Sequence, residues 1–83
     1  IPVSAKDIDL KKSGARADGK TKVTKVLQKA IDEVSAAGGG RVILSGGTFL
    51  TGPVELKSGV ELFIDAKNTA LKLYFTKEKL IKE

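Results

Sequence analysis

The amino-acid sequence predicts a mostly β domain with a single α-helix. Apolar residues recur with helical spacing over positions 23–37, and after the triple glycine at 38–40 they alternate with polar residues. The alternating part is cut into short runs by two or three turn-forming residues at a time. Short strands of this kind form either the hairpins of a small sandwich or the sides of a β-solenoid.

Residues 6–12 are predicted to form the first strand, because Ile8 and Leu10 alternate with polar neighbours. Residues 13–20 follow as a loop, because this stretch contains Gly14, Asp18 and Gly19.

Residues 21–37 are predicted to form the helix. Thr21 is suited to the N-cap, and Gly38 is suited to the left-handed position that ends a helix. The steps between apolar residues place one stripe along about four turns, formed by Val23, Val26, Leu27, Ala30, Ile31, Val34 and Ala37. We expect Leu27 and Ile31 to be among the most buried residues, and the stripe to pack over strands from the 42–64 region.

Short strands are predicted over residues 41–75. Four runs come first, Arg41–Leu44, Thr48–Leu50, Val54–Lys57 and Val60–Ile64, and a fifth covers Ala70–Phe75. The dipeptides Asn-Gly and Asp-Gly, which favour tight hairpins, are absent between them. Their absence favours the solenoid over the sandwich. Residues 76–83 form a tail that could add a helical turn or two.

Composition narrows the functional classes. The 83 residues predict a single domain over 1–83, and no apolar run is long enough to span a membrane. Without Cys or His the chain has no thiol nucleophile, no serine triad and few options for zinc. The net charge of +5 comes mostly from scattered lysines with few aromatic residues, which predicts a solvated surface rather than a nucleic-acid interface.

The motifs that suggest chemistry are weak in this sequence. The glycines at 38–40 follow a helix, whereas a phosphate loop precedes one, so phosphate binding is not expected. The carboxylate pairs Asp7 with Asp9 and Glu55 with Glu61 lack a neighbouring base or metal ligand, and we interpret them as solvated strand residues. We predict no catalytic, cofactor-binding or metal-binding residue and no cofactor.

Two stretches carry a resemblance to a known family. Residues 14–21 read GARADGKT and are followed by Thr24, Gln28 and the triple glycine, and residues 47–62 read GTFLTGPVELKSGVEL. The first resembles the opening of pectate-lyase-like right-handed parallel β-helix proteins, phage tailspikes among them. The second resembles the polygalacturonase group, family 28 of the glycoside hydrolases.

The resemblance implies a truncated right-handed parallel β-helix of two to three coils, with helix 21–37 as the cap over its first coil. The family's catalytic aspartates, substrate-binding His and basic motif lie in later coils, so no residue here takes a catalytic role. Such proteins are typically secreted or periplasmic. The resemblance therefore implies a structural capping module of a pectin-degrading type of β-helix, without catalysis of its own.

Two other functions stay open: a fragment of a hydrolase acting on polygalacturonate-like polysaccharide, or a small basic binding module. The chain starts with Ile1-Pro2 rather than Met, which favours a processed chain or a piece of a longer protein. Departures from the family pattern, such as Ser13 where the family often has Phe, suggest a distant relative or a redesigned sequence. Polysaccharide would be a partner only if further coils are present.

The end of the solenoid that the helix does not cover would leave residues 60–75 with an unpaired strand edge. We expect self-association there as a two-fold homodimer, in preference to the tail folding over with Leu80 and Ile81 inward.

Overall fold

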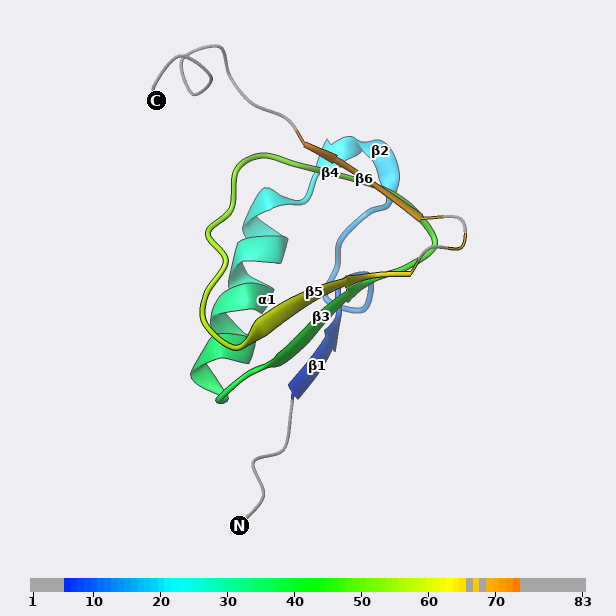
Figure 1. Ribbon diagram of the computed structural model, residues 1–83. Coiled ribbons are helices and arrows are strands. Elements are labelled where there is room, and N and C mark those ends of the chain that lie inside the picture. The colour runs from blue at the N-terminus through cyan, green and yellow to red at the C-terminus, as the bar shows by residue number, and fades with distance from the viewer. Residues whose placement is uncertain (1–5, 66, 68, 74–83) are drawn as a thin grey trace.

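The computed structural model describes residues 6–65, 67 and 69–73, and within them the chain forms two parallel sheets and one helix (Figure 1). The first sheet has the strand order β1-β3-β5 and the second β2-β4-β6. Each pass of the chain therefore adds one strand to each sheet. The elements in chain order are β1 (Lys6–Asp9), β2 (Asp18–Lys22), α1 (Thr24–Ala36), β3 (Gly40–Leu44), β4 (Gly47–Thr51), β5 (Val60–Ile64) and β6 (Thr69–Leu73).

In the first sheet, residues of similar polarity lie side by side on neighbouring strands. Ile8, Val42 and Leu62 are in register across β1, β3 and β5 and belong to or pack against the core. The neighbouring row, formed by Asp7, Arg41 and Glu61, is polar. All these pairings are parallel, so the short strands are not hairpins and the sandwich alternative is excluded for the described residues.

The second sheet contains a strand that the sequence did not predict. β2 pairs with β4 through an irregular register, in which Asp18 lies opposite Thr48 and Lys22 opposite Leu50. The predicted loop over 13–20 is therefore wrong from Asp18 onward. Strand pairing with distant residues, rather than local propensity, determines this element.

The helix begins later than predicted, and Thr21 is not its N-cap. Val23 occupies that position with no side-chain hydrogen bond, and its N–H donates to the carbonyl of Leu50 at 2.8 Å. Thr21 lies in β2, where its hydroxyl donates to Asp18 Oδ2 at 2.9 Å. Thr21 and Lys22, which were expected to start the helix, therefore belong to strand β2 of the second sheet.

The predicted end of the helix is confirmed. Gly38 has φ of 100°, and its N–H donates to the carbonyl of Ser35 at 3.0 Å. The N–H of Gly39 donates to the carbonyl of Val34 at 2.9 Å. These two bonds form a Schellman motif, which needs a left-handed residue that glycine supplies without strain.

One other predicted boundary and one predicted strand are also wrong. The first strand ends at Asp9 rather than residue 12, because the N–H of Lys11 bonds to the Asp9 carboxylate at 3.0 Å and starts a turn. Val54–Lys57 is not a strand of either sheet. The fifth run forms β6 from Thr69 to Leu73, while its last two residues and the tail 76–83 lie outside the described residues.

The core lies between the helix and the two sheets. α1 contacts β1, β3, β4 and β5, which confirms the predicted packing of the stripe. Leu27 and Ile31 have no exposed surface, as predicted, whereas Val26 is half-buried and Ala37 is exposed beyond the helix. The buried apolar residues are Leu10, Ala15, Val23, Leu27, Ala30, Ile31, Val34, Val42, Leu44 and Phe49. In the described part of the chain, no helix has the length and apolar character needed to cross a membrane.

Candidate functional site

An apolar hollow lies where the two sheets end. Its volume is about 310 Å³. Its walls come from the helix, both sheets and the segment 52–57, and are formed by Leu27, Thr51, Pro53, Val54, Leu56, Leu62, Leu71 and Leu73. Apart from Thr51, every lining side chain is apolar. Such a surface fits packed protein side chains better than a sugar or an ion.

The strands beside this hollow are the last of their sheets. Among the described residues β5 pairs only with β3, and β6 only with β4. Large apolar side chains stay exposed here, with Leu56 and Leu73 each 59% exposed. We name this surface, consisting of the hollow and the free edges of β5 and β6, the open end. An open end of this kind is suited to pair with further strands.

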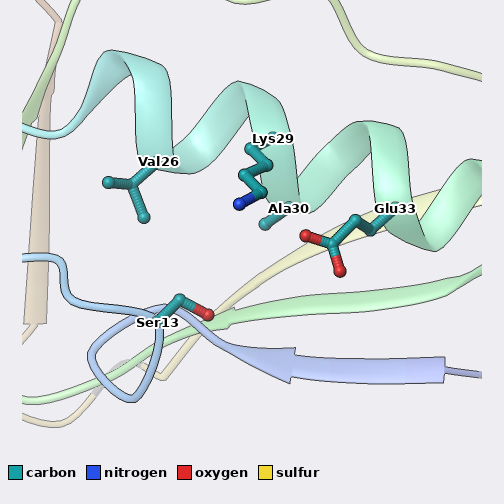
Figure 2. A pocket seen from close by; sticks show the side chains of 5 residues that line it. All are labelled: Ser13, Val26, Lys29, Ala30 and Glu33. Atoms are coloured by element: carbon teal, nitrogen blue, oxygen red, sulfur yellow. The ribbon is translucent and has the colours of Figure 1, made fainter.

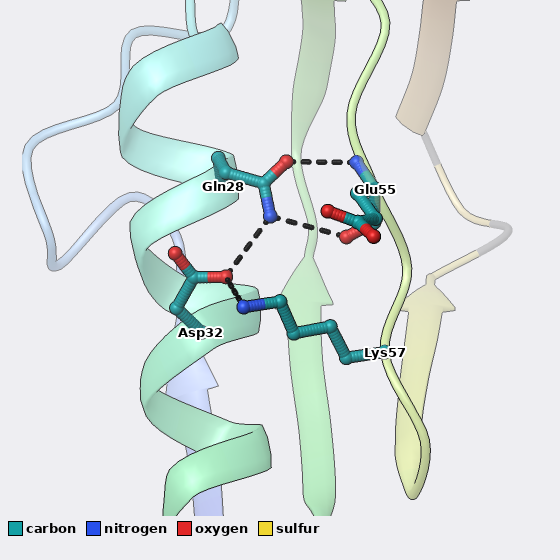
Figure 3. A network of polar contacts seen from close by, with 4 residues as sticks. All are labelled: Gln28, Asp32, Glu55 and Lys57. Carbon is teal, nitrogen blue, oxygen red and sulfur yellow. Dashed lines mark hydrogen bonds and ion pairs between the residues drawn. The ribbon is translucent and has the colours of Figure 1, made fainter.

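The segment 52–57 runs beside the helix and is fixed to it by polar side chains (Figure 3). The Gln28 side chain accepts from the N–H of Glu55 at 2.7 Å and donates to the carbonyl of Glu55 at 3.1 Å. Lys57 Nζ lies 2.8 Å from Asp32 Oδ1. The sequence prediction missed this role of Gln28; the signal that could have indicated it is the four-residue spacing of Thr24, Gln28 and Asp32 on the helix.

The carboxylates weighed in the sequence have separate partners or lie on separate elements. Asp7 pairs with Arg41 at 2.9 Å, and this hydrogen bond lowers the pKa of Asp7 and raises that of Arg41. The Cζ atom of the same guanidinium lies over the ring of Phe63, 5.4 Å from the ring centroid. Asp9 binds the backbone of its own turn, as already described. Glu55 lies on the 52–57 segment and Glu61 on β5, and neither the apolar hollow nor the one between α1 and the turn after β1 is lined by either carboxylate pair.

A second hollow lies between α1 and the turn after β1 (Figure 2). Its volume is about 320 Å³, and it is lined by Ser13, Val26, Lys29, Ala30 and Glu33. Lys29 and Glu33 are exposed side chains on the helix surface. Among the described residues no three or more metal-ligating side chains gather at one place. We therefore regard the open end as the candidate functional site.

Two parallel sheets stacked by successive passes of the chain, with a helix packed against them, define a protein of the β-helix class. The family model for rhamnogalacturonase A/epimerase, pectate lyase-like proteins matches residues 8–83. The chain belongs to this family, and its fold is the polygalacturonase-like fold of the pectate-lyase-like superfamily.

Solved structures agree with this assignment. A candidate glycosyl hydrolase from Parabacteroides merdae is 39% identical with a TM-score of 0.77, over 83% of this chain and 30% of that one. A hyperthermoactive exopolygalacturonase from Thermotoga maritima is 42% identical with a TM-score of 0.70, over 77% of this chain and 14% of that one.

A curated relative matches more locally. Depolymerase 1 of Klebsiella phage KN3-1, which is capsule KN3-specific, is 54% identical over 35 residues, or 42% of this chain and 4% of the depolymerase. The chain thus spans less than a third of the length of each of these three proteins.

Proposed function

We propose that this chain forms the amino-terminal cap and the first two to three coils of a right-handed parallel β-helix, without catalysis of its own. The observation that carries the proposal is the contrast between its two sides. α1 fully buries Ile31 and Val34 against the sheets, whereas the open end exposes apolar side chains and strand edges. A solenoid requires such a cap at its terminus, because an uncovered coil exposes its core and its strand edges to water.

The whole protein to which these coils belong would degrade a polysaccharide of the polygalacturonate type. The exopolygalacturonase from Thermotoga maritima supports this substrate class. The groups for hydrolysis would come from coils beyond the described ones, since the carboxylates here are ion-paired, bound in turns or isolated on the surface.

A chimera tests the capping role. The segment of the Thermotoga maritima exopolygalacturonase that matches this chain would be replaced by residues 6–73, leaving its later coils unchanged. The control is the same enzyme with that segment deleted. We expect the deleted enzyme to aggregate and the chimera to stay soluble and cleave polygalacturonate, because the helix and first coils cover the exposed core.

Two outcomes would contradict the proposal. If the chimera aggregates as the deleted enzyme does, residues 6–73 do not cap a β-helix. If the deleted enzyme is as soluble and as active as the chimera, no cap is needed. The alternative of a basic binding module would be favoured by salt-dependent binding of the isolated chain to a polyanion such as heparin.

A further inference from the structure

Lysines that are far apart in the sequence lie together on the outer face of the second sheet. Phe49 and Thr51 of β4 are buried, so Leu50 between them points to the outer face. Lys22 of β2 and Lys72 of β6 are the in-register neighbours of Leu50 on its two sides, and both are exposed. β2 and β6 flank β4 in this sheet (Figure 1). Because neighbouring strands lie about 4.8 Å apart, the Cα atoms of the two lysines are about 10 Å from each other.

The next row on this face is formed by small side chains and one carboxylate. It consists of Asp18, Thr48 and Ala70, which are in register across the three strands. The Asp18 carboxylate is bonded to backbone N–H groups of its own turn. Lys20 is a further exposed cation of β2. We name this surface the lysine face, and it consists of Asp18, Lys20, Lys22, Thr48, Leu50, Ala70 and Lys72.

The outer face of the first sheet has the opposite charge. Its outward rows contain three carboxylates and one guanidinium, from Asp7, Asp9, Glu61 and Arg41. The guanidinium is already paired with Asp7 at 2.9 Å. The lysine face instead has three ammonium groups and one carboxylate. A polyanion would therefore be attracted to the second sheet and repelled by the first.

We propose that the lysine face binds an acidic polysaccharide of the polyuronate type, as a surface separate from the groups for hydrolysis. Lysine ammonium groups attract carboxylates without requiring a fixed geometry, and the apolar C–H faces of pyranose rings can lie on Leu50 and Ala70. The described residues of this face include no aromatic side chain on which a nucleobase could stack, which favours a polysaccharide over single-stranded nucleic acid. The inference rests on the proposed function for its substrate class.

Binding of the intact 83-residue chain to polygalacturonate tests the lysine face. We expect the double variant Lys22→Gln and Lys72→Gln to weaken binding at low salt at least about fivefold, because two cations are lost. The matched control is Lys6→Gln with Lys29→Gln, which removes the same charge at exposed positions outside the second sheet. Equal weakening by the two double variants, or no binding by the unchanged chain, would overturn the proposal.

Amide chemical shifts measured during the same titration locate the bound polymer. We expect the amides of Thr48, Leu50 and Lys72 to shift with polygalacturonate and to stay unchanged with its fully methyl-esterified form, which has no charge. The largest shifts in β1, β3 or α1, equal binding of the esterified polymer, or tighter binding of single-stranded DNA would overturn the proposal. Each of these results would leave the capping role intact, because the chimera measures that role separately.

Discussion

At the scale of single residues, several polar side chains of this protein complete backbone hydrogen bonding where the strands give way to turns. Asp18 is the fullest case, since its carboxylate accepts from the N–H groups of Lys20 and Thr21 and from the Thr21 hydroxyl. Such bonds favour the charged form, and they lower the pKa of Asp18 from 3.8 to about 2. The turn that starts β2 therefore depends on an ionised carboxylate.

This carboxylate predicts a specific dependence of stability on pH. Because the folded pKa lies below the unfolded value, Asp18 stabilises the fold above about pH 4, and this contribution is lost as the pH falls through about 2. Asp18→Asn should lower the free energy of unfolding at pH 7 and flatten its decline between pH 4 and pH 2. Urea unfolding at several pH values measures both effects. An identical pH profile in the two proteins would contradict the prediction.

Gly40 carries a steric constraint at the start of β3. Its φ is 142°, and a Cβ at this position would lie against the backbone of Lys6 in β1. We expect Gly40→Ala to lower the free energy of unfolding by more than the ~1–3 kcal/mol of backbone strain alone, because β1 must also move. Gly14→Ala is the control, since its φ is 103° but a Cβ there meets nothing within 4 Å. Equal losses in the two variants, measured by urea unfolding, would show that the contact with Lys6 is unimportant.

At the scale of elements, α1 has two faces with different tasks. One face buries an apolar stripe on the sheets, and another binds the segment 52–57 through Thr24, Gln28 and Asp32. The exposed pair of Asp32 and Lys57 lowers the pKa of Asp32 through the hydrogen bond from Lys57, but exposed ion pairs stabilise proteins weakly. The apolar face therefore contributes most of the free energy that holds the helix on the sheets. The polar face fixes the position of the segment 52–57.

Leu27 tests the apolar face. It has no exposed surface and also forms part of the wall of the hollow. Leu27→Ala should lower the free energy of unfolding by about 2–5 kcal/mol, a large share of what a small domain has. Lys25→Ala, on the exposed side of the helix, should change it by less than about 0.5 kcal/mol. Similar values for the two variants in urea unfolding would show that the stripe is not core.

At the scale of the whole molecule, the open end determines whether the isolated chain associates with a second copy. Its hollow, its strand edges and the exposed Leu56 and Leu73 all lie at the same end of the fold. In a longer protein this surface would be covered by the next coil. In the isolated chain we propose that a second copy covers it as a two-fold dimer, which would protect the edges of both chains.

Sedimentation across a concentration series measures this association. We expect a dimer at high micromolar concentration, and the double variant Leu56→Asp and Leu73→Asp should weaken it at least about tenfold by placing charges on the apolar surface. Lys11→Asp, on the turn after β1, is the control for the charge change. A monomer at all concentrations, or equal weakening by both variants, would contradict association through the open end.

The isolated chain should not cleave polygalacturonate. The carboxylates of its described part lie apart, and the chain has no His to act as a base. A reducing-end assay with purified chain measures this directly. Turnover that follows the chain through successive purification steps and is lost when the chain is removed by an antibody would contradict the prediction.

The sequence by itself determined the elements whose cause is local. The apolar spacing over 23–34 and the left-handed position of Gly38 define the helix and its end, because both depend on residues within one or two turns. β3 and β5 were also predictable, since alternation and flanking glycines mark them. The motifs at 14–21 and 47–62 indicated the family.

Only the tertiary structure decided β2, the start of the helix and the role of residues 52–57. Thr21 is a good N-cap by local chemistry, but pairing of β2 with β4 places it in a strand. Val54–Lys57 has the alternation of a strand, yet its backbone partner is the side chain of Gln28, 27 residues earlier. Local propensity is worth a fraction of a kcal/mol per residue, so partners brought together by folding outweigh it wherever the two disagree.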